Sequence, residues 1–118
     1  MDITSLPRAT TCRLIDFERV DLLPGPSDDT YIVVVSGQKP SMNMDVRLSP
    51  LIYLTDPGID LPDYWGIEVV GCTGGITVPA LVPFVASLIV GGDRGTVGKG
   101  GIEIIGASEP RQIPLPPA

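Results

Sequence analysis

The sequence predicts an all-β protein, and three features indicate this fold class. Gly and Pro together supply 27 (14 + 13) of the 118 residues, and both disfavour the interior of a helix. The other residues are rich in Val, Ile, Leu and Thr, which suit a pleated surface. A short apolar strand also recurs, at residues 66–72 and 101–107 and more loosely at 31–37. We therefore predict a single small antiparallel β-sandwich of about six to eight strands.

Pairs of Leu and Ile precede the three strand copies at a constant spacing. They stand at positions 14, 51 and 88, so they are 37 residues apart each time. This spacing predicts three similar hairpins, each made of a Leu-Ile strand, a loop and a copy of the repeated strand. Such a triplication also fits a pseudo-threefold β-trefoil or β-prism. The copies differ in detail, because Val33 stands where the others have Glu68 and Glu103, and the sandwich is favoured.

The first half of the chain divides into three predicted strands. Residues 10–20 alternate loosely and form a first long strand, and the turn residues at 22–29 form a loop. Residues 31–35 are apolar on both faces, which is typical of a central strand. Residues 44–49 alternate as a half-buried strand, and Pro50 indicates an edge position or a bulge.

The second half holds the most apolar stretch, residues 76–90, which contains Pro79 and Pro83. It is shorter than the roughly 20 apolar residues of a spanning helix, so a core or interface strand is predicted. The glycine-rich segment 91–101 lacks the spacing of a phosphate-binding loop and is expected to be a flexible hairpin loop. We place a single domain at residues 1–109. The Pro-rich tail at 110–118 is predicted to be extended or disordered, with no ladder.

The composition argues against several classes of partner. The net charge of −6 repels phosphate backbones, so neither nucleic acid nor an anionic membrane is expected. The chain has no His, which removes the commonest general base and metal ligand. The first residues do not form a charged segment followed by an apolar core, so no signal peptide is predicted. A cytoplasmic location is therefore expected, and reduced, buried thiols are favoured for Cys12 and Cys72 over a disulfide between them.

A ligand site is one functional hypothesis, located where the loops of a sandwich gather. Asp at several loop positions indicates either calcium coordination or ordinary turn chemistry, and turn chemistry is favoured. An adjacent Tyr and Trp indicate a stacking platform for a sugar or small ring, although a core anchor with a rim neighbour is favoured. The candidate ligand-binding residues are Asp56, Asp60, Asp63, Tyr64, Trp65, Arg94 and Lys99, with Asp28, Asp29 and Asp93 as further loop acids.

Glu68 and Glu103 occupy equivalent places in two of the strand copies. If those strands were neighbours in register, the two carboxylates would form an acid–base pair for a hydrolase. A solvated face is the favoured explanation, since charged residues are rarely buried unpaired. No other catalytic motif is evident, so an enzyme is the less favoured class and no catalytic residue or cofactor is assigned.

The apolar stretch around residues 78–90 is too long for a small sandwich to cover completely. Exposed apolar patches of this kind tend to be interfaces. We therefore expect a homo-oligomer or a tight complex with a protein partner. The leading functional hypothesis is a non-catalytic β-sandwich module for self-assembly or protein–protein interaction, ahead of ligand binding at the loop end and of a carboxylate-dependent hydrolase.

Overall fold

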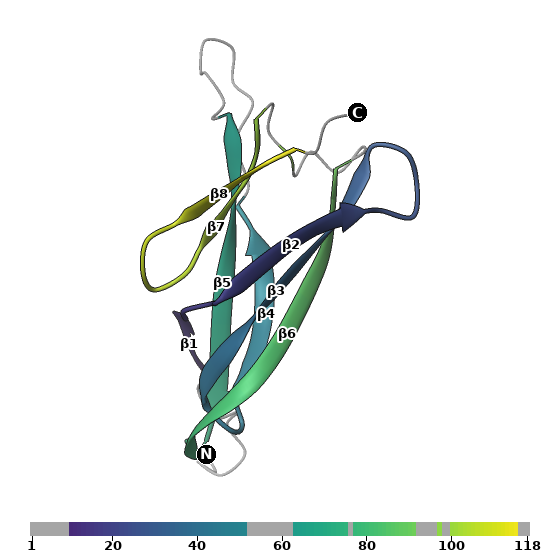
Figure 1. Cartoon of the computed structure of the whole chain (residues 1–118). Coiled ribbons are helices and arrows are strands. Elements are labelled where there is room, and N and C mark those ends of the chain that lie inside the picture. The colour runs from purple at the N-terminus through teal and green to yellow at the C-terminus, as the bar shows by residue number, and fades with distance from the viewer. Residues whose placement is uncertain (1–9, 52–62, 76, 92–96, 98–99, 116–118) are drawn as a thin grey trace, which may run out of the picture.

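The structure, a computed structural model, describes residues 10–51, 63–75, 77–91, 97 and 100–115. This part of the chain is all-β, and two sheets pack together as a small sandwich (Figure 1). The all-β sandwich predicted from the sequence is confirmed. The eight strands are β1 (Thr10–Leu14), β2 (Arg19–Pro24), β3 (Thr30–Ser41), β4 (Asp45–Pro50), β5 (Tyr64–Gly74), β6 (Pro79–Gly91), β7 (Gly101–Ile105) and β8 (Arg111–Pro114).

The five-stranded sheet is built around β5, which has a different partner along each part of its length. One side of β5 pairs with β4. On the other side, β1 pairs with residues 70–74 and β7 pairs with residues 64–68. The β5–β7 pair is parallel, whereas the other strand pairs of the two sheets are antiparallel. Pro50 lies at the end of β4, which pairs only with β5, so the predicted edge position is confirmed.

The three-stranded sheet has the order β2-β3-β6, with the 12-residue β3 between two edge strands. The central position predicted for residues 31–35 is therefore correct. The start of β6 is tied to the turn between β3 and β4, because the Met42 amide donates to the Val78 carbonyl at 2.9 Å. Ser41, which is 1% exposed, places its Oγ 3.1 Å from the same carbonyl.

The core lies between the two sheets and is aliphatic. Alternate residues of each strand point inward, as the two-residue period of a strand requires. Val33 and Val35 of β3 and Ile67 and Val69 of β5 are all completely buried. The remaining buried hydrophobic residues are Ile15, Met44, Leu48, Phe84, Ala86, Val90, Ile102 and Ile104.

The predicted first strand at residues 10–20 is wrong, because the chain crosses between the sheets at residues 15–18. Ile15 still donates to the Val69 carbonyl of β5 at 3.1 Å, and Glu18 already donates to the Ser36 carbonyl of β3 at 2.8 Å. Phe17 packs against the core between them. The Arg111 guanidinium lies 5.0 Å from the Phe17 ring centre and donates to the Glu18 carbonyl at 3.3 Å. The charged residues at 16–19 therefore mark a change of sheet rather than one solvated face.

Two of the three predicted hairpins are also wrong, whereas the second one forms: β4 pairs antiparallel with β5, and the Leu51 amide donates to the Gly66 carbonyl at 2.9 Å. Leu14 pairs with Val70 of β5, and Leu88 pairs with Val33 of β3, so neither Leu-Ile pair precedes its own hairpin partner. The two closest copies of the repeated strand, β5 and β7, are parallel neighbours in one sheet. Strands of similar sequence fit neighbouring positions because they bury the same alternate residues, and this does not require them to belong to repeated hairpins.

The predicted absence of a ladder in the Pro-rich tail is wrong for residues 111–114, which form β8 against β7. Pro110 precedes the strand and Pro114 ends it, so Arg111, Gln112 and Ile113 keep their amides. β8 is a short edge strand, the position at which flanking prolines are tolerated.

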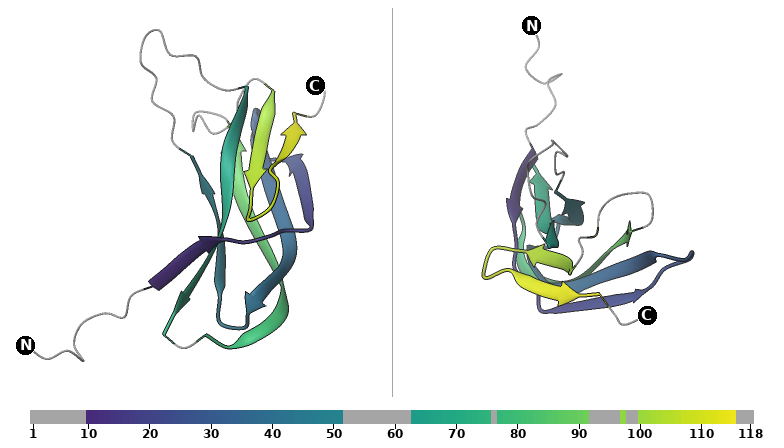
Figure 2. Two further views of the ribbon diagram at one scale, coloured as in Figure 1. Left: turned by 90° about the vertical axis from the view of Figure 1, so that its left-hand side faces the viewer. Right: turned by 90° about the horizontal axis from the view of Figure 1, so that it is seen from above.

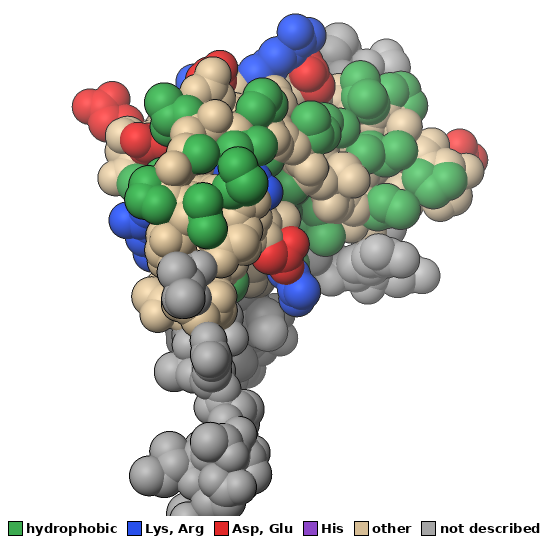
Figure 3. Space-filling view, turned by 90° about the horizontal axis from the view of Figure 1, so that it is seen from below, with side chains coloured by type: hydrophobic (Ala, Val, Ile, Leu, Met, Phe, Trp, Pro, Cys, Tyr) green, Lys and Arg blue, Asp and Glu red, His purple; other side chains and the backbone are tan. Residues whose placement is uncertain are grey.

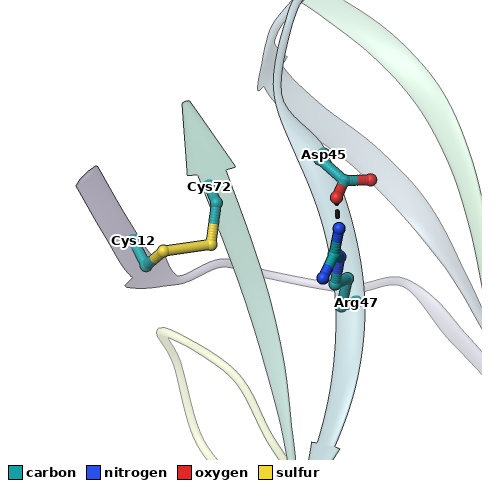
Figure 4. Close-up of a disulfide and its surroundings, with 4 residues drawn as sticks. All are labelled: Cys12, Asp45, Arg47 and Cys72. Atoms are coloured by element: carbon teal, nitrogen blue, oxygen red, sulfur yellow. Dashed lines mark hydrogen bonds and ion pairs between the residues drawn. A yellow bond between two sulfur atoms is a disulfide. The ribbon is translucent and has the colours of Figure 1, made fainter. Parts of the chain in front are cut away.

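The prediction of reduced thiols is wrong, because Cys12 and Cys72 form a disulfide between β1 and β5 (Figure 4). The two residues are directly paired, and their Cα atoms lie 4.1 Å apart. Three positions along the ladder, Ile15 and Val69 form a hydrogen-bonded pair. Hydrogen-bonded and non-hydrogen-bonded pairs alternate in an antiparallel ladder, so Cys12 and Cys72 form a non-hydrogen-bonded pair, the kind in which side chains come closest. The two cysteines are 60 positions apart and meet only when β1 pairs with β5. The expected cellular compartment, on which the prediction of reduced thiols is based, carries no information about this pairing.

Within the described residues, no helix is long and apolar enough to cross a membrane.

Candidate functional surface

The outer face of the three-stranded sheet carries several exposed hydrophobic side chains. Because successive residues point to opposite faces, the odd-numbered residues of β6 face outward while Phe84, Ala86 and Val90 enter the core. Leu81 and Val85 are 74% and 73% exposed. The other outward hydrophobic residues of this face are Leu23, Ile32, Val34, Pro83 and Ile89.

Backbone groups on β6 lie along an open edge beside this face. The Gly25 amide bonds the Thr30 carbonyl at the β2–β3 turn, so alternation assigns the even-numbered residues of β3 to bonds with β2 and the odd-numbered ones to bonds with β6. The register pairs Val33 with Leu88 and Val35 with Ala86. The even-numbered residues of β6 therefore bond to β3, and the amides of Val85, Ser87 and Ile89 point away from it.

Charge is absent from β6, whose 13 residues include no Asp, Glu, Lys or Arg. At the opposite edge of the same sheet, β2 carries an ion pair between Arg19 and Asp21, at 2.9 Å. Figure 3 shows hydrophobic side chains gathered in groups on the molecule as seen from below, with charged side chains at the border of the view and between the groups. The apolar surface thus continues to one edge of the sheet, and charges border it at the other.

The predicted loop-end site is only partly described by the structure. Asp56, Asp60, Arg94 and Lys99 lie outside the described residues, as does Asp93. The starts of β5 and β7, the end of β6 and the β2–β3 turn lie at one end of the sandwich (Figures 1 and 2). Asp63 is exposed there, and its carbonyl accepts a bond from the Gly100 amide at 2.8 Å. Ligand binding and calcium coordination at this end stay predictions.

Tyr64 and Trp65 begin β5 and point to opposite faces of its sheet. Trp65 pairs with Ile102, which is completely buried, so its half-buried side chain belongs to the core-facing row. The Tyr64 ring lies against Gly100, where an added Cβ would come 2.9 Å from the ring. This arrangement supports a core anchor with a rim neighbour.

Glu68 and Glu103 lie on neighbouring strands but are not opposite each other. Gly66 pairs with Glu103, and Glu68 pairs with Ile105, so the carboxylates are offset by two residues on the outer face. Both side chains are half-buried. The direct cross-strand pair that the hydrolase hypothesis requires is therefore absent from this register.

Two hollows that sequence reasoning missed flank Arg13, whose side chain is exposed at the end of β1. One, of about 340 Å³, is lined by Thr11, Thr73 and Thr77 together with Met44 and Gly75. The other, of about 300 Å³, lies between Arg13, Asp16, Gln38 and an apolar wall that includes Leu81. Both hollows are formed by residues from distant parts of the chain, so no local sequence pattern predicts them.

No group of three or more Cys, Asp and Glu residues in the described part of the chain is placed to hold a metal ion. Comparison of this chain with protein-family models, curated proteins and solved structures found no match.

Proposed function

We propose that this protein is a non-catalytic β-sandwich module that self-associates through the apolar side of its three-stranded sheet, which includes the edge of β6. The observation that carries the proposal is the exposure of Leu81 and Val85, each about three-quarters open to solvent within one uncharged strand. Continuous apolar patches on a protein surface mark interaction sites. Side chains of this kind gain free energy when another surface covers them, at about 25 cal/mol per Å² of apolar area buried.

A second copy of the chain is the partner that the charge distribution favours. Two copies with a net charge of −6 repel each other, so they associate only where neither presents acidic groups. β6 is the longest strand of the described sheets and is uncharged. A basic protein partner would be expected to meet acidic residues. Among the outward residues of β2, β3 and β6, only Asp21 is acidic, and Arg19 already pairs with it.

Sedimentation velocity over a concentration series tests the proposal, with Val85→Lys as the variant. Lysine at this exposed position places a charge in the middle of the apolar face without entering the core. We expect the wild type to sediment as a dimer and the dissociation constant of the variant to rise at least roughly tenfold, the equivalent of about 1.4 kcal/mol.

Ser108→Lys is the matched control, because it adds the same charge at an exposed position outside both sheets. Its dissociation constant should match that of the wild type. A wild type that stays monomeric at high concentration contradicts the proposal.

The disulfide bears on the cellular location, which stays a prediction. Cytosolic glutathione and thioredoxin keep thiols reduced, whereas Cys12 and Cys72 are bonded here. An oxidising compartment therefore suits this module better than the cytoplasm expected from the sequence. Thiol labelling of protein from its native source tests this, since complete labelling of both cysteines before reduction would favour the cytoplasm.

A further inference from the structure

We infer that two copies join edge to edge through β6, which forms one continuous six-stranded sheet across a twofold axis. This inference rests on the proposed self-association and names the strand that performs it. The face alone does not determine how two copies meet, because apolar faces also stack on each other. The backbone of β6 distinguishes the two arrangements.

The first observation is the open edge itself. The amides and carbonyls of Val85, Ser87 and Ile89 point away from β3, and the described part of the chain gives them no other backbone partner. Figure 1 shows β6 along the right-hand side of the molecule, with β3 as its neighbour within the sheet. A row of this kind is a template for an added strand.

The second observation is the lack of any device that prevents such pairing. Edge strands are normally protected by charges, by prolines or by shortness. Pro83 protects the first part of β6 because it lacks an amide at an outward position. The seven residues from Phe84 to Val90 contain neither a proline nor a charge, and Ser87 stands at their centre.

The third observation is that this segment is complementary to itself. When two copies run antiparallel about Ser87, Ser87 faces Ser87 and Val85 faces Ile89 of the second copy. All these residues present outward amides, so each pair exchanges two backbone hydrogen bonds. The aliphatic side chains meet across the join on the outer face. Registers centred before Ser87 would place Pro83 opposite Ser87 or Ile89 and lose a donor.

This arrangement closes on itself. A twofold contact uses the same surface of both copies and leaves no second binding edge. The outermost strands of the joined sheet are the two β2 strands, each with the exposed Arg19–Asp21 ion pair. Charge at these positions opposes further edge pairing. The expected assembly is therefore a dimer and not a fibre.

Ser87→Pro tests the inference, because it removes an outward amide and leaves the bonds between β6 and β3 in place. The same strand already accepts Pro83 at an equivalent outward position. The variant loses two intermolecular bonds, one from each copy, and the dissociation constant should rise by roughly 30-fold. Circular dichroism checks that the fold is kept. A folded Ser87→Pro variant with the wild-type dissociation constant overturns the inference.

Leu23→Lys separates edge pairing from stacking of the faces. Leu23 lies on the outer face but on β2, the edge far from the join. Edge pairing predicts that this variant stays dimeric. Dissociation of Leu23→Lys with a dimeric Ser87→Pro overturns edge pairing and leaves the proposed function intact, whereas a monomeric wild type removes both.

Ser87→Cys provides a readout that does not depend on weakening the dimer. Two Cα atoms in a hydrogen-bonded antiparallel pair lie about 5.5 Å apart, within the range that a disulfide spans. Mild oxidation should yield a covalent dimer on a non-reducing gel. Ser49→Cys on β4, which is also exposed, should stay monomeric under the same oxidation. Equal cross-linking of both variants, or none at Ser87→Cys, counts against the inference.

Discussion

The two edges of the three-stranded sheet differ although they border the same central strand. The outer face of β2 carries Arg19 and Asp21, joined at 2.9 Å. On β6 the corresponding outward residues are hydrophobic or hydroxylic, with Val85 nearly three-quarters exposed. Both strands pair with β3 along residues 31–36. The two strands therefore differ in the charge of their outward residues. Charge protects the β2 edge from pairing, whereas its absence leaves the β6 edge able to accept a partner strand.

The edges of the five-stranded sheet resemble β2 and not β6. β4 carries an ion pair between Asp45 and Arg47 at 2.7 Å and ends at a proline (Figure 4). β8 is only four residues long, and β1 is tied to its neighbour by the disulfide. Each of these is a recognised way to limit edge pairing or fraying. Among the described edge strands, only β6 has a second half with neither charge, proline nor covalent link.

The largest expected effect concerns the covalently held edge. The Cys12→Ala/Cys72→Ala double variant frees a loop of 60 residues in the unfolded chain, which should lower the free energy of unfolding by about 4 kcal/mol. Urea denaturation of the wild type and the variant measures this. Self-association of the folded fraction should be retained, because β6 lies in the other sheet. A variant as stable as the wild type contradicts the expectation.

A smaller effect compares two adjacent positions on β6. Ala86→Pro removes an amide that bonds to β3 and inserts a ring into the core, so we expect a loss of roughly 3 kcal/mol. Ser87→Pro removes an amide at the open edge and should cost the monomer less than about 1 kcal/mol, as at other surface positions. Urea denaturation at a concentration below the dissociation constant checks both variants. Equal losses would show that the alternation assigned to β6 is wrong.

The smallest change in stability is expected when β2 is made to resemble β6. The Arg19→Val/Asp21→Val double variant removes an exposed ion pair, and such pairs contribute at most about 1 kcal/mol. Its assembly should change far more, because both edges of the sheet would then lack charge. We expect species larger than a dimer in sedimentation velocity experiments. A double variant that remains a dimer would show that the ion pair does not limit growth.

The sequence predicts those parts of the fold that depend on local alternation. Residues 31–35 are apolar at every position, and residues 44–49 are apolar at every second position. Both patterns are typical of strands, and the structure has strands at residues 31–35 and 45–49. The apolar stretch ending at Val90 is an edge strand with an exposed outer row. Its interface role remains a proposal. Composition alone was also sufficient for the all-β class.

Pairings between distant strands could not be read from the sequence. Cys12 meets Cys72 because β1 returns to β5 across 60 residues, and no spacing rule indicates that pair. The parallel register offsets Glu68 from Glu103 by two positions, although their places in the repeat are equivalent. The hollows beside Arg13 combine four or more strands and turns. The disulfide, the strand register and the hollows all depend on which distant strands become neighbours. Strands with similar local sequence patterns pair with different neighbours, so the pattern alone does not identify them.

The division of β5 between two partners has a consequence for the order in which the molecule folds. During synthesis from the N-terminus, residues 70–74 can pair with β1 as soon as they emerge, but residues 64–68 must wait for β7. Until then, half of one side of the central strand lacks its neighbour. Non-local and parallel pairings of this kind form slowly. The last segment to be made, β7 with β8, therefore completes the sheet, and a chain interrupted before Gly101 would expose the backbone of β5.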